Sequence, residues 1–169
     1  MKLRVVGIGK AWATDDAVGP IIVRRLAVRF ENALPVNHKI DLTFANSPEP
    51  AVDLLHMLDD CDILIIIDAV RSGALPGTIH QHVWLPDLIE SRGVERTSSH
   101  GLGVREILAL AAELDRLPEH IFLWGIEVVS TEPGDTLSPP VAMALDDVVK
   151  QLSQTLEIYI KTIVERGTL

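Results

Sequence analysis

The sequence has little cysteine, few aromatic residues and no long hydrophobic run. Cys61 is the only cysteine, which excludes an intrachain disulfide and a paired-cysteine metal site. Aromatic residues make up 4% of the chain, so Leu, Ile, Val and Ala must build the core. The apolar run at residues 63–67 is far shorter than the roughly 20 residues that span a bilayer. Residues 1–10 are too short and too soon interrupted by glycine for a signal peptide. We therefore expect a soluble, cytoplasmic protein.

Positive charge is also scarce, with 15 Lys and Arg against 24 Asp and Glu and a net charge of −9. Nucleic-acid phosphates and anionic membrane surfaces both attract clustered Lys and Arg, so the composition argues against either partner. A chain of 169 residues that is 47% apolar has the size and content of one globular domain, residues 1–169. The pattern shows no heptad and no long apolar surface stretch, and we expect a monomer.

Short apolar runs alternate with amphipathic stretches along the chain. Strands are predicted at residues 3–8, 39–45, 63–68, 78–84 and 121–129. Helices are predicted after Asp15 or Asp16 to about residue 29, from Pro48 or Pro50 to Leu58, over 102–114 and over 139–163. Ser138 reads as the N-cap of the last helix, with Pro139 in its first turn. The fourth strand begins only ten residues after Asp68, which leaves too little chain for a crossover helix, so this strand is expected to be antiparallel to its predecessor. The order is typical of an α/β fold, a three-layer α/β/α sandwich with a mostly parallel, twisted sheet of about five strands.

Polar residues at the carboxyl ends of the predicted parallel strands are the first candidates for a site, because ligands bind at that edge of such sheets. Asp15 and Asp16 follow the first strand, Asp68 closes the third, and His100 lies between serines and glycines before the third helix. Singly, each has an ordinary explanation, such as capping of the first helix by Asp15 or Asp16. Together, two carboxylates and an imidazole suit nickel, zinc, cobalt or manganese and leave coordination positions open. Such a site can activate water or polarise a carbonyl.

Other motifs give weaker signals. Gly7 and Gly9 resemble the start of a dinucleotide fingerprint, but Trp12 stands where the third glycine belongs. Gly9 and Lys10 lack the upstream glycine and the following Ser or Thr of a P-loop. No GxSxG nucleophile elbow occurs. His80 and His82 alternate on one strand face, where they would either bind a metal or meet solvent.

Two further residues have open roles. Cys61 stands among acidic residues that disfavour its thiolate, which argues against a nucleophile. Glu127, near the end of the fifth predicted strand, either supports the site or faces solvent.

Four segments together point to a known family. They are GIGKAWATDDAVG at residues 7–19, ILIIIDAVRSGALPGT at 63–78, SSHGLGV at 98–104 and GIEVVSTEPGDTLSPPV at 125–141. In order and spacing they resemble the [NiFe]-hydrogenase maturation endopeptidases. The resemblance implies a phosphorylase/hydrolase-like fold and a metal-dependent endopeptidase. Its partner would be a [NiFe]-hydrogenase large-subunit precursor, from which it would remove the C-terminal extension after nickel insertion.

The resemblance also implies roles for single residues. By position, the metal contacts fall on Asp16, Asp68 and His100, with nickel carried by the substrate. Zinc or cadmium could occupy the same ligands. Asp15 is a further catalytic candidate that would orient a water or hold His100. Two other functions stay open: a non-catalytic nickel-checking or nickel-binding module for hydrogenase assembly, and a metallohydrolase of small substrates with a resident ion.

The sequence departs from the family's pattern at two places. Lys10 stands where the family usually has Asn, and residues 45–50 replace an Asp-Gly-Gly-Thr-like loop. The prolines of that segment predict a different substrate groove. Residues 84–100, which contain Gly93, predict a mobile lid just before His100.

Overall fold

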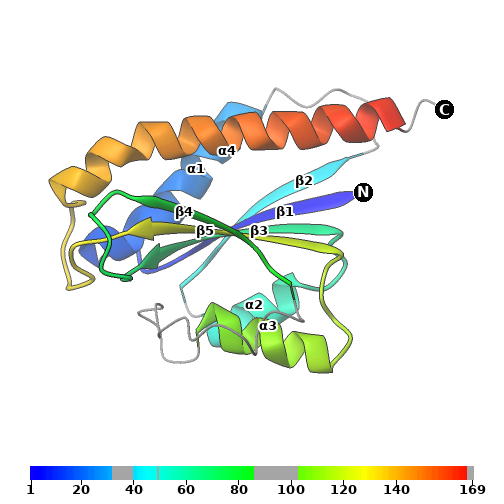
Figure 1. The fold of residues 1–169 in the computed structure, drawn as a ribbon, viewed down its shortest axis with the longest axis horizontal. Coiled ribbons are helices and arrows are strands. Elements are labelled where there is room, and N and C mark those ends of the chain that lie inside the picture. Colours follow the sequence, from blue (N-terminus) through cyan, green and yellow to red (C-terminus); the bar gives the residue numbers. More distant parts are fainter. Residues whose placement is uncertain (32–39, 49, 86–102, 167–169) are drawn as a thin grey trace.

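The computed structural model describes residues 1–31, 40–48, 50–85 and 103–166. Its elements follow the predicted order (Figure 1). They are β1 (Lys2–Ile8), the 3-10 turn η1 (Thr14–Ala17), α1 (Val18–Phe30), β2 (Asp41–Ser47), α2 (Pro50–Met57), β3 (Ile63–Val70), β4 (Ile79–Val83), α3 (Val104–Glu113), β5 (His120–Glu127) and α4 (Pro139–Arg166).

The five strands form one sheet in the order β2-β1-β3-β5-β4. The pairs among β2, β1, β3 and β5 are parallel, and β4 is antiparallel to β5. This confirms the predicted mostly parallel sheet with one antiparallel strand. β4 pairs with β5 rather than with β3, which precedes it in the chain. The first seven residues of β3 are buried, as expected for a central strand covered on both faces.

Helices cover both faces of the sheet, which confirms the three-layer sandwich (Figure 1). Side chains of β3 alternate between two cores: Ile65 and Ile67 pack on the side of α1 and α4, and Leu64 and Ile66 on the side of α2 and α3. Continuing this alternation, Asp68 points to the α2/α3 side. A Cβ on Gly125, the partner of Asp68 on β5, would lie 2.9 Å from Val70, so Gly125 shares this face.

Two local predictions at the start of α1 and the end of β3 are wrong. Asp68 does not close β3, because pairing with β5 continues to Val70. Asp15 and Asp16 do not cap α1: they lie in η1, and the N-cap of α1 is Ala17, without a side-chain hydrogen bond. Both carboxylates accept hydrogen bonds from other segments instead.

Among the described helices, none combines the length and the apolar character that crossing a membrane requires.

Candidate functional site

Buried polar side chains of the described residues gather at the carboxyl edge of the parallel strands. Five of the six lie there, and the sixth, Ser153, lies in α4. The five are Asp15 and Asp16 after β1, Ser47 at the end of β2, Asp68 near the end of β3 and Glu127 at the end of β5. Because burying a charge is costly unless hydrogen bonds compensate it, four buried carboxylates at one edge mark this edge as the candidate site.

Asp16 is held directly behind the exit of β1. The backbone N–H of Lys10 donates to Asp16 Oδ2 at 2.8 Å. Gly9 has a φ of +133°, and a Cβ there would lie 1.9 Å from the carbonyl oxygen of Asp16, so this close approach requires glycine. The departure at Lys10 leaves the contact intact, because the donor is a backbone amide that any residue but proline supplies.

Asp15 is fully buried and faces the connection between β5 and α4. Its Oδ1 accepts the N–H of Ser138 at 2.6 Å, and its Oδ2 accepts the N–H groups of Val129 at 2.9 Å and Ser130 at 3.2 Å. The Ser138 hydroxyl donates to Oδ2 at 2.8 Å. Four donors from residues 129–138 thus surround this carboxylate.

Further backbone contacts join the same two segments. Thr14 donates its hydroxyl to the carbonyl oxygens of Ser130 and Glu132, at 2.8 and 2.9 Å. Its N–H donates to Gly134, whose own N–H donates to Trp12. The carbonyl of Ser138 accepts the N–H of Ala142, which confirms Ser138 as the N-cap position of α4, although its hydroxyl serves Asp15. The turn that carries Asp16 is therefore fixed to the segment before α4.

Asp68 has a side chain buried in the middle of this edge, with 8% of its surface exposed. β3 lies between β1 and β5, and η1 contacts β3, so the turn that bears Asp16 adjoins the strand that bears Asp68. His100 and residues 86–100 of the predicted lid lie outside the described residues, and the described chain resumes at Gly103, the N-cap of α3. Within the described part of the chain, no three His, Cys, Asp or Glu side chains form a group that could hold a metal. Asp16 and Asp68 are two members of a predicted set whose third is His100.

Glu127 is buried, and its carboxylate holds the loop that follows β3. Oε1 accepts the N–H groups of Ser72 and Gly73 at 2.8 and 2.9 Å. Oε2 accepts the Ser72 hydroxyl at 2.7 Å and lies 3.1 Å from His80 Nε2. Burial by itself raises the pKa of Glu127, but the hydrogen bonds from Ser72, Gly73 and His80 outweigh it and hold the pKa below its usual value. Of the two roles left open from sequence, facing solvent is wrong. The available signal was its place at the end of a predicted parallel strand.

Of the remaining sequence candidates, His80 touches this site through Glu127. His80 is half-buried against Glu127, while His82 is exposed two residues along β4. Cys61 precedes β3 at the opposite edge of the sheet. Burial raises the pKa of its thiol, with Asp62 adding to the rise, so the thiolate is disfavoured as expected but mainly for a different reason.

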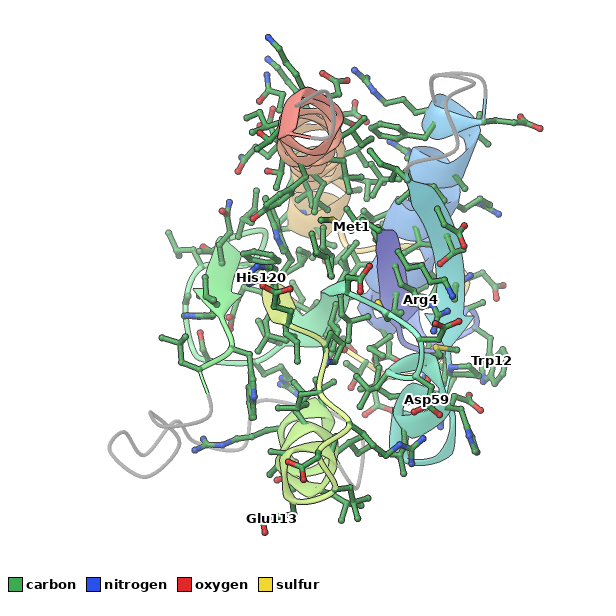
Figure 2. All side chains as sticks on the ribbon, turned by 90° about the vertical axis from the view of Figure 1, so that its right-hand side faces the viewer. Met1, Arg4, Trp12, Asp59, Glu113 and His120 are labelled. Carbon is green, nitrogen blue, oxygen red and sulfur yellow. The ribbon has the colours of Figure 1, made fainter. Side chains whose placement is uncertain are left out.

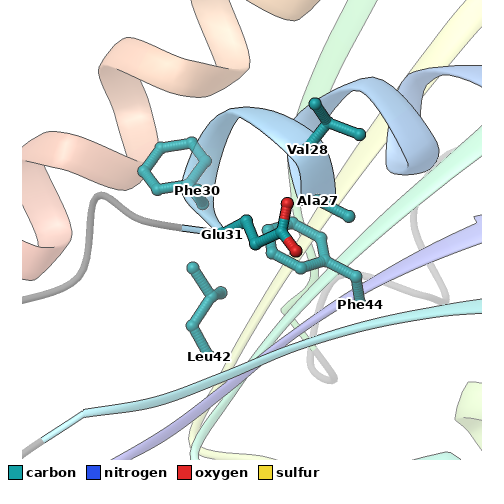
Figure 3. Close-up of a pocket in the computed structure, with 6 residues that line it drawn as sticks. All are labelled: Ala27, Val28, Phe30, Glu31, Leu42 and Phe44. Atoms are coloured by element: carbon teal, nitrogen blue, oxygen red, sulfur yellow. The ribbon is translucent and has the colours of Figure 1, made fainter.

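A pocket of about 420 Å³ also lies away from the carboxyl edge (Figure 3). It opens where α1 ends above the start of β2, and Leu42 in its wall pairs with Leu3 at the start of β1. Its lining is apolar except for one carboxylate: Ala27, Val28, Phe30, Glu31, Leu42 and Phe44. This pocket contains none of the candidate catalytic residues.

Comparisons with known proteins agree with the geometry. The model of the hydrogenase maturation protease family, HycI, matches residues 37–155. Hydrogenase 2 maturation protease of Escherichia coli is 27% identical over 92% of this chain and 91% of that protein. Hydrogenase expression/formation protein HupD of Bradyrhizobium diazoefficiens is 26% identical over 98% of this chain and 80% of that protein. The solved structure of hydrogenase maturating endopeptidase HybD from E. coli superposes with a TM-score of 0.72 and 27% identity, covering 94% of each chain.

The family model covers more than half of the chain, and the fold superposes on that of a hydrogenase maturating endopeptidase. The chain belongs to the hydrogenase maturation protease family.

Proposed function

We propose that this protein is the endopeptidase that removes the C-terminal extension of a [NiFe]-hydrogenase large-subunit precursor after nickel insertion. The observation that carries the proposal is the pair of buried carboxylates, Asp16 and Asp68, at the carboxyl edge of adjoining strands. The family match and the similarity to the E. coli maturation protease and endopeptidase support the reaction class. We further propose that the protein acts in the cytoplasm as a monomer.

Nickel enters this proposal as part of the substrate. Two carboxylate oxygens and the imidazole of His100 form a donor set that suits a borderline divalent ion such as nickel, and zinc or cadmium would fit the same set. Asp16, Asp68 and His100 would contact the ion in the precursor, so that only a loaded precursor docks with its scissile bond in place. A metal held there supplies polarisation of a carbonyl or of water.

Neighbouring residues of the chain hold the proposed metal-contacting carboxylates in place. The Lys10 N–H holds the Asp16 carboxylate, and pairing with Gly125 of β5 fixes the backbone of Asp68. Asp15 was a candidate for orienting water or holding His100. Its four hydrogen bonds support a different part in the same proposal, which is to hold the turn that carries Asp16. Holding reacting groups in a fixed geometry is a large source of rate enhancement.

The test is a mass spectrum of the precursor. The large-subunit precursor encoded nearest this protein is prepared with and without nickel, incubated with the protein, and its C-terminus is read. Loss of a defined C-terminal segment only from the nickel-loaded precursor is the expected result. Association without shortening would overturn the proposal in favour of a nickel-checking module. An ion held tightly and stoichiometrically by the purified protein alone would favour a small-substrate metallohydrolase.

A further inference from the structure

The loop between β3 and β4, residues 71–78, is held at both ends by a single residue, Glu127. At the start of the loop, the carboxylate accepts the N–H groups of Ser72 and Gly73 and the Ser72 hydroxyl. At its end, the backbone of Glu127 accepts the N–H of Gly77 at 2.8 Å and donates to the carbonyl of Thr78 at 2.9 Å. The side chain and the main chain of one residue therefore close the loop from opposite sides.

Contacts within the loop and with α4 restrict it further. Thr78 donates its hydroxyl and its N–H to the carbonyl of Leu75, at 2.6 and 3.0 Å. Gly77 has a φ of +87°, and a Cβ there would lie 2.8 Å from the carbonyl oxygen of Pro140 in α4. Between these anchors the loop presents Leu75, whose surface is 82% exposed.

Stability alone does not explain a carboxylate at position 127. Taking a carboxylate out of water carries a large free-energy cost until its hydrogen bonds compensate, and an apolar side chain avoids that cost. What the carboxylate adds is a loop with one conformation. An exposed leucine on a fixed loop loses little conformational entropy on contact with a partner, which favours binding.

The loop borders the candidate site. It leaves β3 three residues after Asp68, and Glu127 lies on the neighbouring strand β5 opposite Val70. By the alternation of strand side chains, Asp68, Val70 and Glu127 all point to the α2/α3 side of the sheet. The start of the loop and Asp68 therefore lie at the same edge of the sheet, two to four residues apart along the chain.

We propose that Glu127 is a positioning residue that fixes residues 71–78 as one wall of the active site, where Leu75 contacts an apolar side chain of the polypeptide substrate. This inference rests on the proposed function for its substrate, a protein chain. It assigns Glu127 to binding of the precursor. Cleavage of the peptide bond is left to the site that contains Asp16 and Asp68.

Four variants test the inference with the precursor cleavage assay and with hydrogen exchange of the free protein. Glu127→Ala removes the acceptor. Glu127→Gln keeps Oε1 for the N–H groups of Ser72 and Gly73 and turns the second position into a donor that the Ser72 hydroxyl can accept. Leu75→Ala removes the exposed leucine side chain. It leaves intact the hydrogen bonds from Ser72 and Gly73 to the Glu127 carboxylate, which we call the clamp. Ser153→Ala, a buried serine of α4 that donates to Val149, is the control for a general loss of stability.

For Glu127→Ala we expect the amides of Ser72 and Gly73 to exchange at least about tenfold faster and KM for the precursor to rise about tenfold, with kcat within about threefold. Glu127→Gln should restore both values to within about threefold of the unsubstituted protein. Leu75→Ala should raise KM without changing exchange, and Ser153→Ala should change neither.

Three outcomes would overturn the inference. They are a Gln variant as impaired as the Ala variant, a fall in kcat at unchanged KM, or an unchanged KM in Leu75→Ala. If the unsubstituted protein cleaves no precursor, the proposed function fails. Hydrogen exchange then tests the role of Glu127 separately, because it needs no substrate. Equal exchange rates of the Ser72 and Gly73 amides in the Gln and Ala variants would contradict that role.

Discussion

The two edges of the sheet differ in how far their charged side chains are exposed to solvent. At the amino edge, Lys2 pairs with Asp60, whose side chain is 78% exposed, and Arg116 pairs with Asp59, which is 51% exposed. Figure 2 looks onto this edge, where Arg4 lies beside Asp59 and donates to its carbonyl oxygen. At the carboxyl edge four carboxylates are buried, and the donors to Asp15, Asp16 and Glu127 are mostly backbone N–H groups.

This difference separates a solvated surface from a site. Exposed ion pairs contribute little to the free energy of unfolding, because water and salt screen the attraction and two long side chains must be ordered. Buried carboxylates persist only where fixed donors replace water, and such donors keep each oxygen in place. Substitutions of charged residues at the amino edge should therefore have small effects on stability and activity. Substitution of a buried carboxylate at the carboxyl edge should have a large effect on one or the other.

The largest effect is expected for Asp68→Asn. An amide cannot supply the anionic oxygen that the proposed metal contact uses, so cleavage of the nickel-loaded precursor should fall at least about 100-fold. The matched control is Asp60→Asn at the amino edge, which should cleave at the normal rate. Circular dichroism should show both variants folded. Equal activity of the two variants would remove the distinction between the edges.

The next effect concerns the stability that Asp15 provides. Asp15→Ala leaves three backbone N–H groups and the Ser138 hydroxyl without their acceptor, at about 1–3 kcal/mol for each donor that stays buried and unpaired. We expect the free energy of unfolding to fall by about 3 kcal/mol or more. Ser138→Ala removes one donor and should cost about 1 kcal/mol. Urea unfolding of both variants measures the ratio, and similar losses would show that the backbone donors find other partners.

The third effect is a pH dependence that belongs to the clamp at Glu127. Its pKa is lowered in the folded protein, so its contribution to stability is present above the ordinary carboxyl value and is lost as pH falls through the folded pKa. His80 on β4 also contacts this carboxylate, with 3.1 Å between His80 Nε2 and Glu127 Oε2. Thermal unfolding between about pH 5 and pH 3 should show the unsubstituted protein losing more stability than Glu127→Gln. Parallel curves would contradict the assigned pKa direction.

The fold was largely predictable because the strands carry a strong hydrophobic signal. The run at Ile63 to Ile67 is buried on both faces and became the central strand β3. The short connection after it predicted the antiparallel β4. Element ends were less accurate: β2 runs from Asp41 to Ser47 rather than over residues 39–45, because pairing with β1 rather than local propensity sets its length.

The site was predictable only to the level of residue position. Placement at strand ends identified Asp15, Asp16 and Asp68, but the partners of Asp15 lie more than 100 residues away, at Val129, Ser130 and Ser138. The same reason left Glu127 undecided, since its donors lie in the loop after β3. A single sequence shows no such long-range pairing, and capping of α1 was the local explanation that tertiary contacts replaced.

The smallest effect is expected at the amino edge, for Asp59→Asn. The hydrogen bond from Arg116 holds the pKa of Asp59 below its usual value, but both groups meet solvent, and the Arg116 Nη2 also donates to the carbonyl of Leu55 at 3.2 Å. The arginine therefore keeps a partner when the carboxylate is neutralised, and salt already screens the lost attraction. The melting temperature should change by no more than the error of its measurement, in low and high salt alike, and precursor cleavage should be unchanged. A clear loss of stability that salt abolishes would show that exposed charge contributes at this edge too, and the contrast between the two edges would then be one of degree.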